Sequence, residues 1–307
     1  MMGNSTQISF FTFTAYIHSG QLKSVYFITV LLLYLFIVLS NVLLVVVIVL
    51  NRSLHEPMYM LLCSLFFNEL YGSTGLFFFL MVQILSDIHT ISPSLCYLQV
   101  FCLYSYGGVE FWILTAMSYD RYLSICFPLQ YNTRMTTNRV LSLIAVSWLI
   151  PFLIDCVLIS LAVTSELCDT DINRLYCDFY SIFKLACHGT AASHFTQLIS
   201  SIVLILCCVT PVLYSYTRIF KVCCRGSKQT RQKAFSTCMP HLASLFNFIF
   251  GIYLEGVQAK FDVDGVPQTL RVFTSLYFLI CQPLVNPLIY GLKLPKIRIK
   301  CKTLIFG

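Results

Sequence analysis

The sequence is poor in charge: only 11% of its 307 residues are Asp, Glu, Lys or Arg, whereas 58% are hydrophobic. Soluble domains carry about 25% charged residues, so this composition excludes a soluble protein and is typical of a membrane protein. Enzyme motifs are also missing. The stretch "HEPMY" from His55 is not H-E-x-x-H, and the chain contains no Gly-x-Ser-x-Gly and no phosphate-binding loop. We therefore expect no enzymatic activity.

The sequence also lacks a signal peptide, internal repeats and low-complexity segments. The first twenty residues, "MMGNSTQISFFTFTAYIHSG", have no basic start, short apolar core or small-residue cleavage site. We therefore expect the first membrane span to insert without a cleaved leader. Without repeats or linkers, residues 1–307 are expected to form a single domain.

Long apolar runs are what the sequence does contain. A membrane-spanning helix needs about 20 mostly apolar residues. Such windows occur at residues 26–50, 58–85, 95–125, 140–163, 195–217, 234–254 and 272–292. The sequence thus predicts an all-α membrane protein, a seven-transmembrane helix bundle over 26–292, with an N-terminal segment at 1–25 and a short basic tail at 293–307.

Lys and Arg concentrate on one side of this bundle, as expected for the cytoplasmic side. If the N-terminus is outside, 15 of the 20 basic residues lie at inner ends and loops, and only Lys23, Arg174, Lys184, Lys260 and Arg271 lie outside. We therefore expect the N-terminus outside and the C-terminus inside. The net charge of +7 then indicates contact with anionic membrane lipids and a cytoplasmic docking face, and no nucleic-acid binding. The alternative is that most of these charges serve only to set the topology.

This topology places four of the 15 cysteines on the oxidising side: Cys96, Cys168, Cys177 and Cys187. Four cysteines permit three connectivities, and the spacing alone leaves them open. The others make no C-x-x-C pair of the kind that binds metals. Asn4 begins an N-x-[ST] sequon on the same outer side and is a candidate glycosylation site.

Ionisable residues within spans are costly and are therefore functional candidates. Glu69 lies roughly 18 Å above the inner start of the second span, and Glu110 roughly 16 Å above Arg121 in the third. Two carboxylates at one depth would repel unless a cation such as Na+ or a proton lay between them. The simpler alternative is that each is hydrogen-bonded and one is protonated. Asp155, in the fourth span, is expected to make only a local polar contact.

The third span carries a consistent face. Glu110 and Arg121 are eleven positions apart, close to three helical turns, so they share one side. Four residues near this side follow an i, i+3, i+4, i+7 pattern: Tyr104, Gly107, Gly108 and Phe111. The two glycines would let a ligand or another helix approach closely. Helix packing alone is the alternative explanation of this set.

Five motifs give the chain a family resemblance along nearly its whole length. "MSYDRYLSICFPLQY" resembles the M-A-Y-D-R-Y-V-A-I-C-x-P-L-x-Y signature of odorant (olfactory) receptors, a family of rhodopsin-like G-protein-coupled receptors. "LHEPMYMLLCSL", "KAFSTCMPHL" and "PLVNPLIY" agree in order and place. "CDTDINRLYCDFYSIFKLAC" resembles the three-cysteine extracellular loop of that family.

The resemblance implies roles for individual residues. Cys96 would pair with Cys177, and Cys168 with Cys187. Asp120 would hold Arg121 at rest, and on activation Arg121 would meet the C-terminal helix of a G protein α subunit of the type that stimulates adenylyl cyclase. The basic stretch "RIFKVCCRGSKQTRQK" would form a third loop beside the same cavity. Further activation positions are matched by Tyr216, His241, Asn286, Pro287 and Tyr290.

The resemblance also implies an odorant pocket in the outer half of the bundle. It further implies that the protein lies in the plasma membrane, in the cilia of olfactory neurons. By family position and depth, the pocket would be lined by Tyr104, Gly107, Gly108, Ser200, Ser201, Ile252, Tyr253, Gly256, Leu276 and Leu279. The set is apolar with a few hydroxyls, which suits a small, weakly polar molecule. Glu255, near the outer end of the sixth span, could select a cation or amine or could point towards lipid headgroups.

Some positions depart from the family pattern, and other protein classes compete with it. Glu69 stands where members carry Asp, Pro240 where many carry Ser, and Ile249 where many carry Tyr.

A retinal protein would need a lysine within 272–292, which contains none, and an amine receptor would want an aspartate near Leu103 in the third span. A non-olfactory chemosensory receptor, or a transporter that relays protons through paired carboxylates, remains an alternative. No cofactor is expected apart from a structural Na+.

Overall fold

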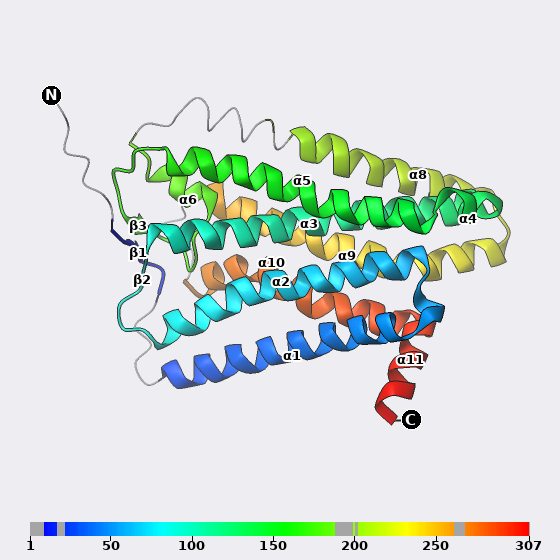
Figure 1. Ribbon diagram of the computed structural model, residues 1–307, viewed down its shortest axis with the longest axis horizontal. Coiled ribbons are helices and arrows are strands. Elements are labelled where there is room, and N and C mark those ends of the chain that lie inside the picture. The colour runs from blue at the N-terminus through cyan, green and yellow to red at the C-terminus, as the bar shows by residue number, and fades with distance from the viewer. Residues whose placement is uncertain (1–8, 17–21, 188–198, 200–201, 261–267, 307) are drawn as a thin grey trace.

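The structure is a computed structural model, and it describes residues 9–16, 22–187, 199, 202–260 and 268–306. Within these ranges seven helical segments are long and apolar enough to cross a membrane. The long helices run lengthwise through the molecule (Figure 1). They comprise α1 (Lys23–Leu50), α2 (Pro57–Leu85), α3 (Pro93–Cys126), α5 (Thr137–Val163), the span Ile202–Arg225 that ends in α8 (Thr210–Arg225), α9 (Lys228–Lys260) and α10 (Gln268–Lys293). The predicted seven-helix bundle is confirmed.

Short elements mark the two ends of this bundle. At one end, here called the sheet end, β1 (Phe11–Phe13) pairs antiparallel with β2 (Thr90–Ile91) and parallel with β3 (Asp171–Ile172), beside α6 (Phe179–Lys184). The opposite end, here called the α4 end, carries α4 (Tyr131–Arg134) and α11 (Pro295–Phe306) (Figure 1). The remaining turns are η2 (Arg52–Leu54), η3 (Pro128–Gln130) and a π turn, η4 (Ile205–Val209).

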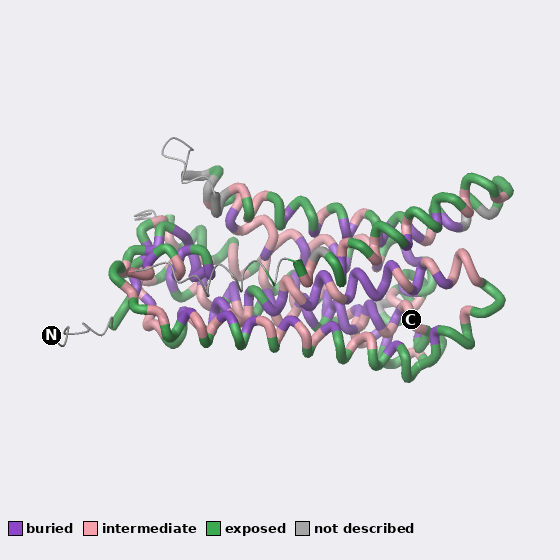
Figure 2. Tube along the Cα trace, turned by 90° about the horizontal axis from the view of Figure 1, so that it is seen from above, coloured by how far each residue is buried: buried purple, intermediate pink, exposed green. Residues whose placement is uncertain are grey.

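Helix α3 is the centre of the bundle. In its most apolar window 67% of the residues are buried, whereas the other six spans have between 18% and 50%. Buried segments follow the middle of the molecule and exposed ones its outside, as Figure 2 shows. Because α3 contacts α2, α5, α8 and α9, side chains on every face of it are available for interhelical contacts.

The outer surface of the bundle is apolar. Large hydrophobic side chains such as Leu39, Phe78 and Phe246 are each more than two-thirds exposed. Water would not favour such a surface, but hydrocarbon does, since a bilayer core is as apolar as these side chains. The protein is therefore a multi-pass membrane protein.

A proline in α10 illustrates how broken helix hydrogen bonds are repaired. The carbonyl of Pro283 would normally accept from the N–H four residues later, but that residue is Pro287, which has no N–H. The side chain of Asn41, on α1, donates to this carbonyl at 2.9 Å. In lipid an unsatisfied carbonyl costs several kcal/mol, so this bond fixes α1 against α10.

The basic segment predicted as a third loop is mostly helical, so that prediction was wrong. Helix α8 continues to Arg225, beyond the predicted end at 217, and α9 begins at Lys228 rather than at 234. Lys, Arg, Gln and Ala are good helix formers, and only Gly226 and Ser227 separate the two helices. The predicted start of this fifth span, 195–198, lies outside the described residues.

Candidate functional site

An ion pair is buried at the α4 end of α3. The guanidinium of Arg121 donates from Nε to Asp120 Oδ2 at 3.0 Å and from Nη2 to the same oxygen. Asp120 is fully buried and Arg121 is 7% exposed. Removing two charges from water is expensive, so each of them depends on the other for compensation. The adjacent positions thus form the pair that the sequence suggested.

A tyrosine that the sequence analysis did not single out completes this arrangement. Tyr131, the first residue of α4, donates its O–H to Asp120 Oδ1 at 2.6 Å. Burial, and then the Asp120 charge, raise the pKa of Tyr131, so its hydroxyl remains a donor. Asp120 therefore accepts from Arg121 on one oxygen and from Tyr131 on the other. We call these three residues the latch.

A second contact at this end joins three helices. The rings of Tyr216 and His241 stack with centroids 5.8 Å apart, and Tyr216 Oη is hydrogen-bonded to His241 Nδ1. His241 Nε2 lies 3.0 Å from the carbonyl oxygen of Leu114, which can only accept. Nε2 therefore carries the proton and Nδ1 accepts from the Tyr216 hydroxyl. This network ties α8 and α9 to α3.

The two carboxylates predicted to share a depth meet in the centre of the bundle. Glu69 and Glu110 are fully buried, and both accept from Asn286 Nδ2, at 2.5 and 2.9 Å. Tyr106 donates to the other oxygen of Glu69 at 2.9 Å, and Asn68 donates to the other oxygen of Glu110 at 3.2 Å. Each of the four carboxylate oxygens therefore accepts a hydrogen bond from the protein.

The orientation of the Asn286 amide is fixed by a third partner. Ser244 Oγ donates to Asn286 Oδ1 at 2.7 Å, which turns Nδ2 towards the two carboxylates. One residue later, Pro287 lies inside α10, and Tyr290 follows, buried, with its ring edge-on to Phe66 at 6.4 Å. The PLVNPLIY segment thus contacts α2, α3 and α9.

A cation does not fit this cluster well. The four oxygens face N–H and O–H donors, and Asn286 presents hydrogens rather than an oxygen to the space between the carboxylates. Cations such as Na+ need several oxygens directed at one point. Across the described part of the chain, no group of three or more His, Cys, Asp or Glu could hold a metal ion.

The predicted ligand residues do not form one continuous wall. Tyr104 is 38% exposed, with its ring edge-on to Phe179 at 4.6 Å, and Leu279 is buried beside partly buried Leu276 in the cluster that joins α2, α3 and α10. The three predicted ligand residues on α9, Ile252, Tyr253 and Gly256, are exposed. Ser200 and Ser201 lie outside the described residues.

The two glycines of α3 face different neighbours. A Cβ on Gly107 would lie 3.3 Å from the ring of Phe278, on α10, whereas a Cβ on Gly108 would lie 2.7 Å from Pro151, on α5. Gly108 is therefore needed for close packing of α3 on α5. Helix packing, the alternative explanation of these glycines, is thus supported at Gly108.

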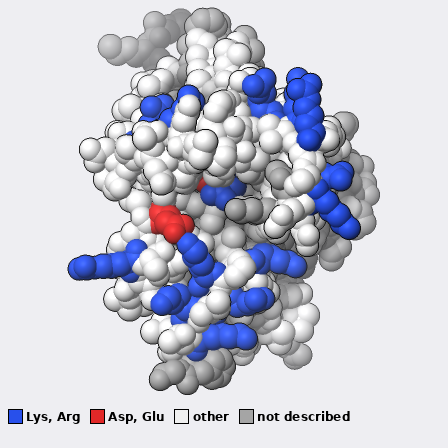
Figure 3. Space-filling view, turned by 90° about the vertical axis from the view of Figure 1, so that its right-hand side faces the viewer, with Lys and Arg blue, Asp and Glu red and all other residues white. Residues whose placement is uncertain are grey.

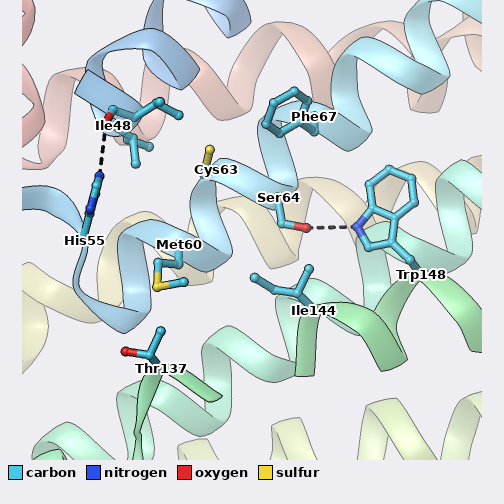
Figure 4. Close-up of a pocket in the computed structure, with 10 residues that line it drawn as sticks. Ile48, His55, Met60, Cys63, Ser64, Phe67, Thr137, Ile144 and Trp148 are labelled. Carbon is cyan, nitrogen blue, oxygen red and sulfur yellow. Dashed lines mark hydrogen bonds between the residues drawn. The ribbon is translucent and has the colours of Figure 1, made fainter. Parts of the chain in front are cut away.

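A pocket of about 870 Å³ lies elsewhere, between α1, α2 and α5. Two hydrogen bonds pair polar groups of its lining: Trp148 Nε1 donates to Ser64 Oγ at 3.0 Å, and the His55 ring bonds the Val49 carbonyl (Figure 4). None of the ligand residues expected from the sequence lines it. The lining consists of Ile48, Val49, His55, Met60, Cys63, Ser64, Phe67, Thr137, Ile144 and Trp148.

The sheet end is held by two disulfide bonds, Cys96–Cys177 and Cys168–Cys187. The first ties the segment after β3 to the start of α3, with Cα atoms 5.5 Å apart. The second closes a loop within the segment that leads from α5. Asp178 caps α6 by accepting from Ser181 N at 3.1 Å.

The α4 end is basic. In Figure 3, which views this end, Lys and Arg side chains surround the face and acidic ones are few. Glu56 pairs with Lys296 at 2.6 Å, and both side chains are more than half exposed. Exposed basic residues around this end include Arg134, Arg139, Arg218, Lys221, Arg225, Lys228, Arg231, Lys293 and Arg298. Such a face attracts acidic surfaces.

The family model and the most similar relatives that were compared agree on one family. The family model described as "Olfactory receptor" matches residues 30–306. Human "Olfactory receptor 11A1" is 33% identical over 95% of this chain and 91% of that receptor. Human "Olfactory receptor 6N1" is 33% identical over 96% of this chain and 95% of its own length, and human "Olfactory receptor 11H6" is 34% identical over 89% and 82%.

These matches cover the bundle, the buried ion pair and the polar centre together. The expectation that the chain is not an enzyme is confirmed, because the matched proteins are receptors. The chain therefore belongs to the olfactory receptor family, whose members respond to small-molecule odorants and couple to G proteins.

Proposed function

We propose that this receptor binds a small odorant in the half of the bundle near the sheet and activates a heterotrimeric G protein at the α4 end. The G protein is of the type that stimulates adenylyl cyclase. The observation that carries the proposal is the latch, in which Arg121 lies buried against Asp120 at the end that is rimmed by basic residues.

In this proposal the latch is the resting state. Asp120 compensates the Arg121 charge while the α4 end is closed, and Tyr131 stabilises Asp120. When α9 moves away from α3, the guanidinium can turn towards the C-terminal helix of the α subunit, because Arg retains its charge and offers five donors. His241, on α9, is hydrogen-bonded to the Leu114 carbonyl on α3, so this bond breaks when α9 moves away from α3.

The orientation that suits this function places the N-terminus outside and the chain, as one domain, in the plasma membrane of sensory cilia. Two features support it. The basic residues gather at the α4 end, as they do on cytoplasmic sides. The disulfides lie at the sheet end, and disulfides form in the oxidising exterior. Asn4 would then be available for glycosylation.

For the odorant we retain Tyr104, Gly107, Leu276 and Leu279, from α3 and α10, with Ile252, Tyr253 and Gly256 from α9. The support is that Tyr104 keeps accessible surface although its ring packs against Phe179 under the sheet end. An apolar lining with a tyrosine hydroxyl suits a small molecule bound by shape and one or two hydrogen bonds.

The Glu69–Glu110 pair is proposed to share a proton rather than to bind Na+. Two ionised carboxylates that both contact Asn286 would repel one another in a medium of low dielectric. A single proton between them removes one charge and leaves the four donated hydrogen bonds intact. This assignment gives the pair a structural role in the resting bundle.

The test is cyclic AMP production in cells whose surface receptor is quantified by antibody, challenged with pooled odorants. Arg121→Ala is expected to abolish the ligand-driven rise while surface protein persists. Lys23→Ala, which removes a positive charge at the sheet end, is the matched control and should retain the response. Retained coupling in Arg121→Ala would refute the role of the latch, and ligand-independent ion flux would favour the transporter alternative.

A further inference from the structure

A cluster of charges lies at the sheet end, away from the residues used so far. Arg174, just after β3, donates from Nη1 to Glu255 Oε1, on α9, at 3.1 Å. Its Nη2 lies 3.7 Å from Asp178 Oδ2. Tyr176 Oη lies 3.2 Å from Glu255 Oε2 and 3.0 Å from the Ser275 carbonyl, on α10. The loop thereby contacts both α9 and α10.

The loop that supplies Arg174 and Tyr176 is held rigidly. Cys177 is bonded to Cys96 at the start of α3, and its N–H donates to Gln99 Oε1 at 2.9 Å. The Tyr16 hydroxyl donates to the Leu175 carbonyl at 2.7 Å. These contacts fix the backbone on both sides of Tyr176, so the charged groups are positioned before any ligand arrives.

The cluster has more negative than positive charge. Arg174 is its one cation among the described residues, and it serves two carboxylates, Glu255 and Asp178. Arg174 is 6% exposed and Asp178 1%. With both carboxylates ionised, the cluster has a net charge of −1, and a buried carboxylate that lacks its own cation is costly.

Hydrogen bonding within the cluster is also incomplete. Among the described residues, Arg174 Nη2 and Asp178 Oδ2 have no hydrogen-bond partner, since 3.7 Å is too long for such a bond. Tyr176 has one hydroxyl hydrogen for two acceptors, Glu255 Oε2 and the Ser275 carbonyl. Burial raises the pKa of Tyr176 well above its usual range, so the hydroxyl does not become a further anion. Glu255 is therefore short of donors.

The cluster is accessible on the side where a ligand would lie. The Glu255 side chain is 26% exposed although its partners are buried. Tyr104, on the neighbouring α3, is 38% exposed, and its ring packs on Phe179, which follows Asp178 in the chain. Tyr104 and Glu255 thus both keep accessible surface at the sheet end, where a small molecule would find the Glu255 carboxylate.

We propose that Glu255, with Asp178 and Arg174, is the recognition site for a positively charged small molecule, a protonated amine. This inference rests on the proposed function and specifies its ligand class. The ammonium would donate to Glu255 and supply the missing positive charge. Arg174 could then close the 3.7 Å gap to Asp178, so that both carboxylates have their own cation. A carboxylate ligand would instead add a third negative charge, which the cluster disfavours.

Binding of this kind would also act on α9. The Arg174–Glu255 bond is a direct tie between the rigid loop and α9, and an ammonium that takes over Glu255 releases it. The acid proposed to select the amine is Glu255 on α9, one of the two roles that the sequence left open for it, whereas the third span has Leu103 and Tyr104 where an amine receptor would carry an aspartate.

The test compares amines with neutral and acidic molecules of the same shape. Linear, cyclic and aromatic primary amines are matched with alcohols and carboxylic acids of the same carbon skeleton. Binding is read as ligand-induced thermal stabilisation of the purified full-length receptor, and coupling as cyclic AMP in cells. Amines are expected to stabilise the receptor. Glu255→Gln is expected to weaken their binding about tenfold, because the amide oxygen can still accept from the ammonium but the negative charge is lost.

Two further variants separate recognition from folding. Glu255→Asp keeps the charge and should restore part of the amine affinity. Glu166→Gln removes an exposed carboxylate at the same end and should leave amine binding at the wild-type level. A loss in Glu255→Gln that Glu255→Asp does not restore would mean a structural role and would overturn the proposal.

The outcomes distinguish this inference from the proposed function. Amine binding without cyclic AMP would support the site and contradict the coupling proposal. Responses to alcohols or acids that require Arg121, with no binding of any amine, would support coupling and overturn the amine site. If no amine stabilises the purified receptor at concentrations up to about 1 mM, equivalent to roughly 4 kcal/mol of binding free energy, the amine site is likewise rejected.

Discussion

Tyr131→Phe is predicted to raise the basal activity of the receptor, because it removes the hydrogen bond to Asp120 Oδ1 that stabilises the latch in the resting state. The hydroxyl donates to Asp120 at 2.6 Å, and phenylalanine keeps the ring but not this bond. Hydrogen bonds to charged groups contribute about 1.5–3 kcal/mol, and since Tyr131 is only partly buried the lower value applies. About 1.4 kcal/mol corresponds to a factor of ten, so the ratio of active to resting receptor should rise about tenfold.

The assay is basal cyclic AMP plotted against surface receptor over a range of expression levels, without added odorant. The slope of this plot measures activity per receptor and is independent of how much protein reaches the surface. Tyr119→Phe is the control, because Tyr119 lies at the same end of α3 and its hydroxyl makes no hydrogen bond within the described part of the chain, where its ring contacts Tyr122 and Arg139. A Tyr131→Phe slope within about twofold of wild type would refute the idea that this bond stabilises the resting state.

Three other substitutions, with Gly256→Ala as a control for one of them, probe the rest of the architecture. Cys96→Ser should reduce surface delivery, measured by antibody, since loss of a disulfide destabilises by about 2–5 kcal/mol; normal delivery would contradict this. Glu110→Gln should leave surface level near wild type, and wild-type responses should not change when sodium is replaced by choline; sodium dependence would favour a cation. Gly72→Ala, whose Cβ would lie 2.3 Å from the Tyr106 ring, should lower the thermal midpoint, whereas Gly256→Ala should not.

The sequence predicted the features that depend on local pattern. Seven apolar windows could be read directly because each hydrocarbon crossing requires a long run, whatever the neighbours are. The Asp120–Arg121 pair could be anticipated because the two residues are adjacent. The common depth of Glu69 and Glu110 followed from helical rise alone, and both carboxylates do lie beside one another in the structure.

Contacts that depend on how distant segments pack could not be predicted from the sequence. Tyr131 reaches Asp120 only because the chain turns through η3 after α3. The bridge from Asn286 to both carboxylates needs the register of α10 against α2 and α3. The two adjacent glycines of α3 had the same apparent role, yet one faces α10 and the other faces α5. Helix rotation about its own axis decides such cases, and a single sequence does not report it.

Helix α9 connects the ends of the bundle in one rigid element. Glu255 and His241 are 14 positions apart on it, about 21 Å along the axis, and Ser244, which orients Asn286, stands between them. At rest α9 is bonded to the loop through Arg174, to α10 through Asn286 and to α3 through the Leu114 carbonyl. A ligand that breaks the first bond removes one restraint on α9, which is also bonded to α8 through Tyr216 and His241 and to α10 through Asn247. Coupling across the membrane then requires that the remaining contacts have an alternative arrangement in which α9 has moved from α3.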